Sequence, residues 1–167
     1  MSVDRGSGNT LEFLCGMVSR LQEAGINCIV FGGWASEFTG LIAARPHTDI
    51  DLLYLGDEFG KLDAFIYSQR DLEEIHAKHF PHKRAFMCRG VMTEIILVSR
   101  KRDRLITSFW NDFEFEWPDI STIRINIQGH QLFVSIPQVV EYYHKHEKEI
   151  DRVRARHVPA AGVQARA

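Results

Sequence analysis

The chain has 167 residues, of which 45% are hydrophobic and 25% are charged, which fits one buried core and excludes two large domains. Its 20 basic and 22 acidic side chains give a formal charge of −2. This balance lacks the overall positive charge of a typical nucleic-acid-binding protein, so we expect no DNA partner.

The first part of the chain alternates between helical and strand patterns. In the helical segments apolar residues recur every three to four positions, and the strand segments are short apolar runs that end at turn residues. Thr10 is expected to cap the first helix. The expected elements are a helix over residues 10–25, a strand over 26–31, a helix over 34–44, a strand over 49–55, a helix over 59–77 and a strand over 91–98.

The second part of the chain predicts further strands and a C-terminal helix. The expected elements are a helix over residues 102–110, two strands within 113–134 around the turn 128–130, and a helix after Pro137. Residues 1–158 are therefore expected to form a single α/β (α+β) domain, with a mixed sheet flanked by helices. Residues 159–167 are rich in alanine and lack periodicity, so we expect a disordered tail there.

The cysteines and the apolar segments indicate a cytoplasmic protein. Cys15, Cys28 and Cys88 are odd in number and lie in apolar surroundings, which favours reduced thiols over disulfides. No apolar run approaches the roughly 18 residues that a membrane-spanning helix needs, so no membrane association is expected. Residues 1–10 are polar and differ from a signal peptide.

Two aspartates on one expected strand indicate a metal site. Successive side chains of a strand alternate between its faces, so Asp49 and Asp51 project from the same side, close enough to share a cation. Adjacent carboxylates repel each other unless a cation lies between them, and Mg²⁺ prefers such oxygen ligands. The alternative is that both aspartates are solvated at the end of a strand.

A glycine pair before the second helix indicates a phosphate site. Because Gly32 and Gly33 have no side chains, a phosphate can approach backbone N–H groups at the start of the helix. Taken alone, a Gly-Gly pair is more often simply a turn. Together with the aspartates, however, it supplies the phosphate cradle and the metal holder of a phosphoryl-transfer site.

Glu94 is an acid in an otherwise apolar run. A buried carboxylate without a partner is costly, so Glu94 lies either at a solvated strand end or in a polar site. If its strand lies beside the strand of Asp49 and Asp51, Glu94 is expected to be a third metal ligand, or a general base for an attacking hydroxyl.

The residues around the glycines and aspartates resemble a known family. The segments are Gly32-Gly33-Trp34-Ala35, Glu37 and Arg45-Pro46-His47-Thr48-Asp49-Ile50-Asp51-Leu52. They are similar to the small antibiotic nucleotidyltransferases, namely the lincosamide and aminoglycoside 2''-adenylyltransferases of the polymerase-β-like superfamily. The likeness is strong over residues 26–55 and weak elsewhere. It implies a polymerase-β-like nucleotidyltransferase fold.

The resemblance also implies an activity. In this family a nucleoside monophosphate, usually AMP from ATP, is transferred to a hydroxyl of a small-molecule acceptor such as an aminoglycoside or a lincosamide. Pyrophosphate is released, and the modification confers antibiotic resistance. By this likeness Asp49 and Asp51 hold Mg²⁺, expected as two ions, Glu94 is the third acid, and Gly32 and Gly33 contact the triphosphate.

Three further residues take roles from the same likeness. Arg45 is expected to neutralise phosphate charge, His47 to belong to the nucleotide-binding loop, and Glu37 to contact the acceptor. Their alternative roles are a cation at a helix end, a structural histidine and an ordinary surface acid. The resemblance also suggests a homodimer that binds ATP, or another nucleoside triphosphate, and a small-molecule acceptor.

Two other groups of residues have competing interpretations. Residues 111–117 alternate aromatic and acidic side chains, which fits either a pocket for a cationic sugar or a strand whose rings face the core. His76, His79 and His82 recur every three residues near Cys88, so a zinc site has to be considered. The broken helical spacing favours unrelated histidines.

Two other functions stay open alongside the antibiotic-type enzyme. Members of the same superfamily act in toxin–antitoxin or abortive-infection pairs, where they modify a protein or tRNA. The third alternative is a catalytically silent nucleotide-binding protein. The set Asp49, Asp51 and Glu94 favours an active enzyme.

Overall fold

The computed structural model describes residues 8–159. In this range the helices are α1 (Leu11–Glu23), α2 (Gly32–Phe38), α3 (Gly60–Ser68) and α4 (Pro137–His157), with a 3-10 turn η1 (His76–Lys78). The strands are β1 (Cys28–Phe31), β2 (Asp49–Leu55), β3 (Glu73–Glu74), β4 (Lys83–Cys88), β5 (Val91–Lys101), β6 (Arg104–Phe109), β7 (Phe113–Glu116), β8 (Thr122–Ile127) and β9 (His130–Ser135). The expected α/β class is confirmed.

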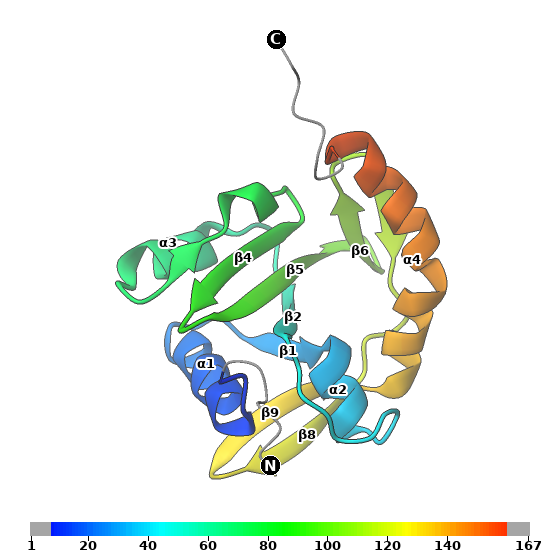
Figure 1. Ribbon diagram of the computed structural model, residues 1–167. Coiled ribbons are helices and arrows are strands. Elements are labelled where there is room, and N and C mark those ends of the chain that lie inside the picture. Colours follow the sequence, from blue (N-terminus) through cyan, green and yellow to red (C-terminus); the bar gives the residue numbers. More distant parts are fainter. Residues whose placement is uncertain (1–7, 160–167) are drawn as a thin grey trace.

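The strands form a mixed sheet flanked by helices. Seven of them follow the order β3-β4-β5-β2-β1-β9-β8, and the long strand β5 also pairs with β6, which pairs with β7. Strand β2 runs parallel to β5 and antiparallel to β1, while β1 runs parallel to β9. Figure 1 shows α1 and α3 to the left of this sheet and α2 and α4 to its right.

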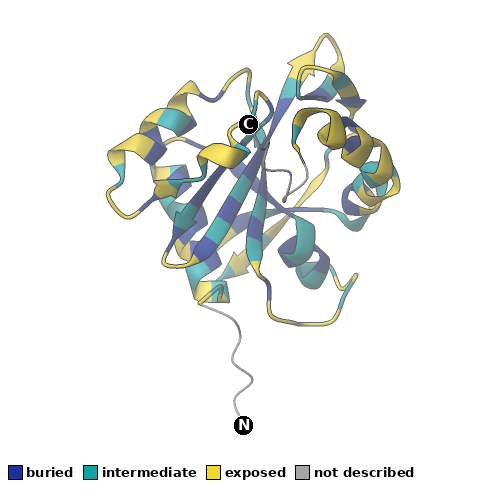
Figure 2. Ribbon diagram, turned by 45° about the horizontal axis from the view of Figure 1, so that its top comes forward, coloured by how far each residue is buried: buried dark blue, intermediate teal, exposed yellow. Residues whose placement is uncertain are grey.

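The core lies where these helices cover the sheet. Figure 2 shows the central strands as mostly buried and the outer sides of the helices as exposed. In α1 the fully buried residues Leu14, Val18 and Leu21 recur at helical spacing. The Thr10 hydroxyl accepts a hydrogen bond from the backbone N–H of Phe13 at 3.1 Å, so the expected cap of this helix is confirmed.

Helix α2 differs from the prediction at both ends. It begins at Gly32 rather than Trp34, and it ends at Phe38 rather than near Ala44. Gly40 adopts a positive φ of 75°, and the N–H that follows it, on Leu41, donates to a carbonyl of the last helical turn. This is a glycine-terminated helix end, which stops the helix although the apolar pattern continues.

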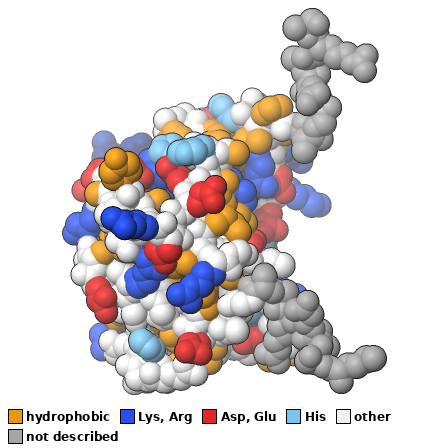
Figure 3. All heavy atoms as spheres, turned by 60° about the vertical axis from the view of Figure 1, so that its left-hand side comes forward, with side chains coloured by type: hydrophobic (Ala, Val, Ile, Leu, Met, Phe, Trp, Pro, Cys, Tyr) orange, Lys and Arg blue, Asp and Glu red, His pale blue; other side chains and the backbone are white. Residues whose placement is uncertain are grey.

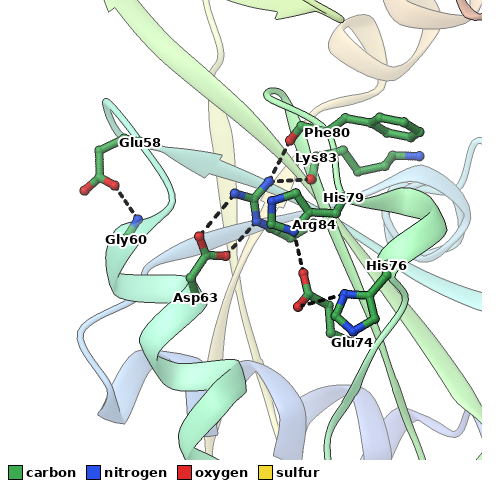
Figure 4. Close-up of polar contacts among 9 residues, drawn as sticks. All are labelled: Glu58, Gly60, Asp63, Glu74, His76, His79, Phe80, Lys83 and Arg84. Carbon is green, nitrogen blue, oxygen red and sulfur yellow. Dashed lines mark hydrogen bonds and ion pairs between the residues drawn. The ribbon is translucent and has the colours of Figure 1, made fainter. Parts of the chain in front are cut away.

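The segment expected as a helix over residues 59–77 is helical only in α3. It then forms β3 and η1, and β4, which the sequence did not predict, follows. The charge of Arg84 interrupts the apolar strand pattern of β4 in the sequence. In the structure its guanidinium lies between α3 and β4 (Figure 4), where Asp63 and two backbone carbonyls accept its hydrogen bonds. The buried arginine is satisfied, so a charged residue occupies a core-facing strand position.

The helix expected over residues 102–110 is wrong, because the segment forms strand β6. Arg102 adopts a positive φ of 59° and turns the chain from β5 into an antiparallel partner. The buried hydroxyl of Thr107 donates to the Leu97 carbonyl at 2.7 Å and accepts a hydrogen bond from Trp117 at 2.8 Å. Pairing with β5 and β7 therefore makes this segment a strand, and local periodicity does not reveal that pairing.

The remaining expectations fall mostly on the C-terminal part of the chain. The hairpin β8–β9 turns at Gln128-Gly129, and α4 begins at Pro137, so both predictions are confirmed. The three cysteines are buried thiols. Within residues 8–159 no helix is long and apolar enough to cross a membrane. The expected disordered tail lies outside the described residues apart from Pro159.

Candidate active site

Three carboxylates lie on one face of two neighbouring strands. Asp49 and Asp51 project from β2 on the face opposite the buried Ile50, as strand alternation requires. In the parallel register between β2 and β5, Asp51 is the partner of Glu94. The structure thus brings together the three acids that the sequence singled out, and it confirms that the strand of Glu94 lies beside that of the aspartates.

The glycine pair lets the backbone approach these groups closely. Gly32 has a positive φ of 59°, and a Cβ atom placed there would lie 2.9 Å from the Cβ of Asp51. A Cβ atom on Gly33 would lie 2.7 Å from Nδ1 of His47. Both distances are shorter than an ordinary van der Waals contact, so any side chain at either position would displace a group of the site.

Glu37 holds the loop that leads into β2. Its Oε1 accepts hydrogen bonds from the backbone N–H of Arg45 at 2.9 Å and lies 3.0 Å from Nε2 of His47. His47 is buried, with its ring 4.4 Å from that of Trp34. The Asn9 amide donates to the His47 carbonyl at 2.9 Å. Glu37 and His47 therefore position the loop, and contact of Glu37 with an acceptor stays a prediction.

A cavity of about 370 Å³ opens beside this loop. Its lining residues are Gly33, Arg45, Pro46, His47, Thr48, Asp49 and Asp51. Arg45 is exposed at its rim. Three of the predicted nucleotide-binding residues, Gly33, Arg45 and His47, therefore line one hollow with the two aspartates, whereas Gly32 is not among its lining residues.

Burial and the neighbouring carboxylates raise the pKa values of both aspartates. Burial, together with the nearby charges of Glu94 and Asp49, raises the pKa of Asp51 to about 7. Burial and Glu94 also raise the pKa of Asp49. Among residues 8–159 neither aspartate forms an ion pair with a cationic side chain. The two acids thus form a negative site that a cation would stabilise.

Glu94 has cationic partners that the sequence did not reveal. Its carboxylate forms ion pairs with Nζ of Lys78, from η1, and with Nζ of Lys83, from β4, the latter at 3.1 Å. Burial favours the neutral acid, but the two lysines outweigh it and lower the pKa of Glu94. Over the described part of the chain, no group of three or more His, Cys, Asp and Glu side chains is arranged to hold a metal ion.

Helix α4 supplies the wall beside Asp51. Tyr143 packs edge-on against Phe31, with ring centroids 5.3 Å apart, and stacks on Trp117 at 5.7 Å. Burial raises the pKa of Tyr143, and Asp51 is among the charges that add to the shift. Tyr143 has no sequence signal beyond helical periodicity, so only the fold identifies it.

The aromatic and histidine segments have structural roles. The rings of Phe115 and Trp117 are buried, while Glu114 pairs with Lys101 at 2.7 Å on the surface, so the strand interpretation of residues 111–117 is confirmed. His82 is buried, and its Nδ1 accepts a hydrogen bond from the backbone N–H of Trp110 at 3.0 Å. This environment lowers the pKa of His82 to about 3, mainly through burial.

Solved structures of the same shape identify the fold. ANT(2'')-Ia in complex with adenylyl-2''-tobramycin matches 87% of this chain and 87% of its own, with a TM-score of 0.58 and 14% identity. The lincosamide antibiotic adenylyltransferase LnuA, bound to lincomycin, matches 87% of this chain and 97% of its own, with a TM-score of 0.66 and 12% identity. The chain has a nucleotidyltransferase fold.

Other proteins with the nucleotidyltransferase fold show the same likeness. A putative nucleotidyltransferase from Thermotoga maritima matches 87% of both chains, with a TM-score of 0.53 and 16% identity. No protein-family model matches the sequence, and no curated protein is significantly similar to it. At these identities the comparisons establish the nucleotidyltransferase fold, and the chemistry has to be argued from the residues of the site.

Proposed function

We propose that the chain is a magnesium-dependent nucleotidyltransferase. It would transfer a nucleoside monophosphate, with AMP from ATP as the first candidate, to a hydroxyl of a small molecule. The observation that carries this proposal is the close approach of Gly32 to Asp51, with Asp49 on the same face and Glu94 as the register partner of Asp51. The backbone of Gly33 and the carboxylates of Asp49 and Asp51 also line one hollow, as a site for a metal-bound phosphate requires.

The donor set fits a magnesium ion. Mg²⁺ takes oxygen ligands and is commonly held by one or two carboxylates together with substrate phosphates and water. Burial, together with the charges of Glu94 and Asp49, raises the pKa of Asp51 to about 7, and a bound cation would offset this repulsion. Asp49 and Asp51 would hold the metal, and Glu94 is the candidate third ligand. When bound, the metal would neutralise charge that develops on the phosphate oxygens.

The triphosphate would occupy the cavity beside the glycine pair. The backbone of Gly33 lines this cavity, and Arg45 at its rim can neutralise a phosphate oxygen. Glu37 and His47 support this nucleotide side by holding the loop in place.

The transfer itself would be an in-line displacement at the α-phosphorus. The bond from the acceptor oxygen to phosphorus forms while the bond to the pyrophosphate oxygen breaks. Glu94, the third acid of the cluster, is the candidate acceptor of the hydroxyl proton; the two lysines keep its carboxylate ionised but also lower its pKa, which weakens it as a base. Its role as third metal ligand is the alternative, and positioning of the two substrates supplies much of the rate enhancement.

The test is incubation of the full chain with Mg²⁺ and labelled ATP, GTP, CTP or UTP, with pyrophosphate release and product mass as readouts. Tobramycin and lincomycin belong in the acceptor panel because structural neighbours were solved with such ligands. We expect Asp49→Asn and Asp51→Asn to abolish transfer, and the exposed Asp103→Asn to leave it intact. Absence of pyrophosphate with every pair, and unchanged nucleotide binding in both site variants, would refute the proposal.

The same experiment separates the alternatives. Label that appears on tRNA or on a protein instead of a small molecule would favour the toxin–antitoxin type of activity. Magnesium-dependent ATP binding without transfer to any acceptor would favour a silent nucleotide-binding protein. Light scattering of the purified chain, with and without nucleotide, tests the proposed homodimer.

A further inference from the structure

Strand β8 forms an open edge of the sheet. It is the terminal strand in the order β3-β4-β5-β2-β1-β9-β8, and within residues 8–159 it pairs only with β9. None of its six residues is buried: four are exposed and two are half-buried. The backbone N–H and C=O groups on its outer side therefore have no partner strand in the described range, and an edge of this kind can pair with another chain.

The side chains of β8 do not protect this edge. Natural edge strands are commonly protected by several charged residues, by proline or by being very short. Strand β8 has the sequence Thr-Ile-Arg-Ile-Asn-Ile, without proline or acid. Its one charged residue is Arg124, whose Cζ lies 5.5 Å from the centroid of the Phe133 ring on β9. The guanidinium therefore covers a face of the hairpin and leaves the open edge accessible.

The other edge strands carry acids. At the opposite end of the sheet β3 has only two residues, Glu73 and Glu74. Strand β7, which pairs only with β6, has four residues and contains Glu114 and Glu116, and both form ion pairs with basic residues of the neighbouring strands. In the part of the chain that the structure describes, β8 is therefore the one edge strand that is both longer than this and free of acids.

A row of three isoleucines runs along β8. Ile123, Ile125 and Ile127 share one face, because alternate side chains of a strand do so. Their register partners on β9 include Leu132 and Val134, which are fully buried, so this is the core face of the hairpin. Ile123 is nevertheless 41% exposed, and the other two isoleucines are half-buried. The apolar core thus reaches the edge of the sheet without being closed there.

We infer that two copies of this chain associate through β8, which pairs with β8 of the second copy in an antiparallel arrangement. A two-fold assembly of identical chains requires a surface that is complementary to itself. Directly opposed residues of antiparallel strands point to the same face, so the two-fold axis has to pass through a residue that opposes its own copy. The inference goes beyond the proposed activity and does not depend on it, and it supplies an interface for the proposed homodimer.

The sequence of β8 is complementary to itself about Ile125. With the axis at this residue, Ile123 opposes Ile127 of the second copy, and all three isoleucines join one apolar row across the interface. On the other face Arg124 opposes Asn126 of the second copy, whose amide oxygen can accept a hydrogen bond from the guanidinium. An axis at Arg124 would instead oppose two guanidinium groups, and like charges directly opposite each other destabilise a strand pair.

The side of the molecule with α1 and α3 has a different character. Figure 3 shows acidic and basic side chains interspersed over it, so this face has no single-signed surface for a charged partner. Among the described residues, the other exposed large apolar side chains are Leu41, Leu55 and Tyr67, which lie on three separate segments. Singly exposed apolar residues are ordinary on monomeric proteins. The edge of β8 is therefore the stronger candidate for association.

Opposite charges at one exposed position test the interface and its register. Asn126→Glu would place an acid opposite Arg124 at two symmetric places, and Asn126→Arg would place a second guanidinium there. We expect Asn126→Glu to lower the dissociation constant of the dimer roughly 2- to 30-fold and Asn126→Arg to raise it by a similar factor. The measurement is sedimentation equilibrium of the full chain without nucleotide. Glu73→Arg, on the edge strand β3, is the matched control and should leave the dissociation constant unchanged.

A cross-link at the axis tests the same register by a second measurement. In Ile125→Cys the thiols of the two copies would oppose each other, with Cβ atoms about 4.5–5.5 Å apart, within reach of a short bifunctional maleimide. The natural cysteines are buried thiols. We expect a cross-linked dimer from Ile125→Cys and none from Tyr67→Cys, a control at a position that is 95% exposed. Circular dichroism establishes that each variant is folded, and the exposed Asn126 variants leave the core unaltered.

The outcomes separate the interface from the activity. Opposite shifts in the two Asn126 variants, together with the cross-link at position 125, support the inference whether or not the chain transfers nucleotides. A chain that stays monomeric at every concentration would overturn it, and full transfer by that monomer would leave the proposed function standing. Equal effects of Asn126→Glu and Asn126→Arg would also overturn it. Cross-linking of Tyr67→Cys without that of Ile125→Cys would overturn it by placing the contact on α3.

Discussion

Replacement of Gly32 by alanine tests the contact on which the site depends. At the φ of 59° that Gly32 adopts, a residue with a side chain costs about 1–2 kcal/mol. For a domain of this size that cost lowers the Tm by roughly 2–8 °C. The added Cβ would lie 2.9 Å from the Cβ of Asp51, whereas carbon atoms in contact are about 3.5–4.0 Å apart, so Asp51 has to shift by roughly 0.6–1.1 Å.

Because Asp51 shifts, we expect a loss of activity that the lower stability alone does not explain. A displacement of about 1 Å in a reacting group lowers the rate by roughly 100-fold. The assays are thermal unfolding and pyrophosphate release under saturating nucleotide, on protein shown by circular dichroism to be folded. Gly129→Ala is the matched control, because Gly129 has a φ of 79° and open space where its Cβ would lie.

The two variants should lose similar stability, but only Gly32→Ala should lose activity. A folded Gly32→Ala protein with the full rate would show that Asp51 does not depend on this close approach. Equal loss of activity in both variants would attribute the defect to backbone strain.

Three further perturbations test other parts of the structure. Because burial and neighbouring carboxylates raise the pKa of Asp51 to about 7 from an ordinary 3.8, the folded state holds this proton more tightly than the unfolded state. Without divalent cations, the Tm should therefore decrease as the pH rises from about 4 to about 7. In Asp51→Asn this decrease should be smaller. Glu37→Ala should release His47 and raise the KM for nucleotide about tenfold, as measured by initial rates. Asp63→Asn should leave the buried guanidinium of Arg84 poorly paired and lower the free energy of unfolding in urea by about 1–3 kcal/mol.

Each of these has a control on the surface. Asp103→Asn should leave both the pH profile and the urea midpoint unchanged, and Glu141→Ala on α4 should leave the nucleotide KM unchanged. If the Tm of Asp51→Asn depends on pH as in the unmodified chain, groups other than Asp51 cause the decrease in Tm. A Glu37→Ala variant with normal KM would exclude a role of the loop in nucleotide binding, and an Asp63→Asn variant as stable as the control would mean that water satisfies Arg84.

Local chemistry made the carboxylate strand readable from the sequence. The alternation of Asp49, Ile50 and Asp51 predicts a strand, and it also predicts which side chains share a face. The strand in the structure has the predicted bounds of 49–55. The acid in β5 was also readable, because a charge in an apolar run needs a polar site. Their proximity requires that the strand of Glu94 lie beside that of the aspartates, as it does in the structure.

The elements that were missed depend on contacts between distant residues. Strand β6 is held by pairing with β5 and β7, and β4 contains Arg84, whose charge is satisfied by Asp63, 21 positions earlier. The sequence does not reveal the two lysines that pair with Glu94 for the same reason. Lys78 and Lys83 lie on a turn and a strand that only the sheet brings to Glu94.

The pairing of β1 has a consequence for synthesis of the chain. Strand β1 is flanked by β2 on one side and by β9 on the other, where Val30 pairs with Val134. The strand that leads into the glycine turn therefore gains its second neighbour only after residues 130–135 have left the ribosome. A nascent chain halted before that point would already contain all three acids, yet it would expose β1 as an open edge, available for pairing with another chain.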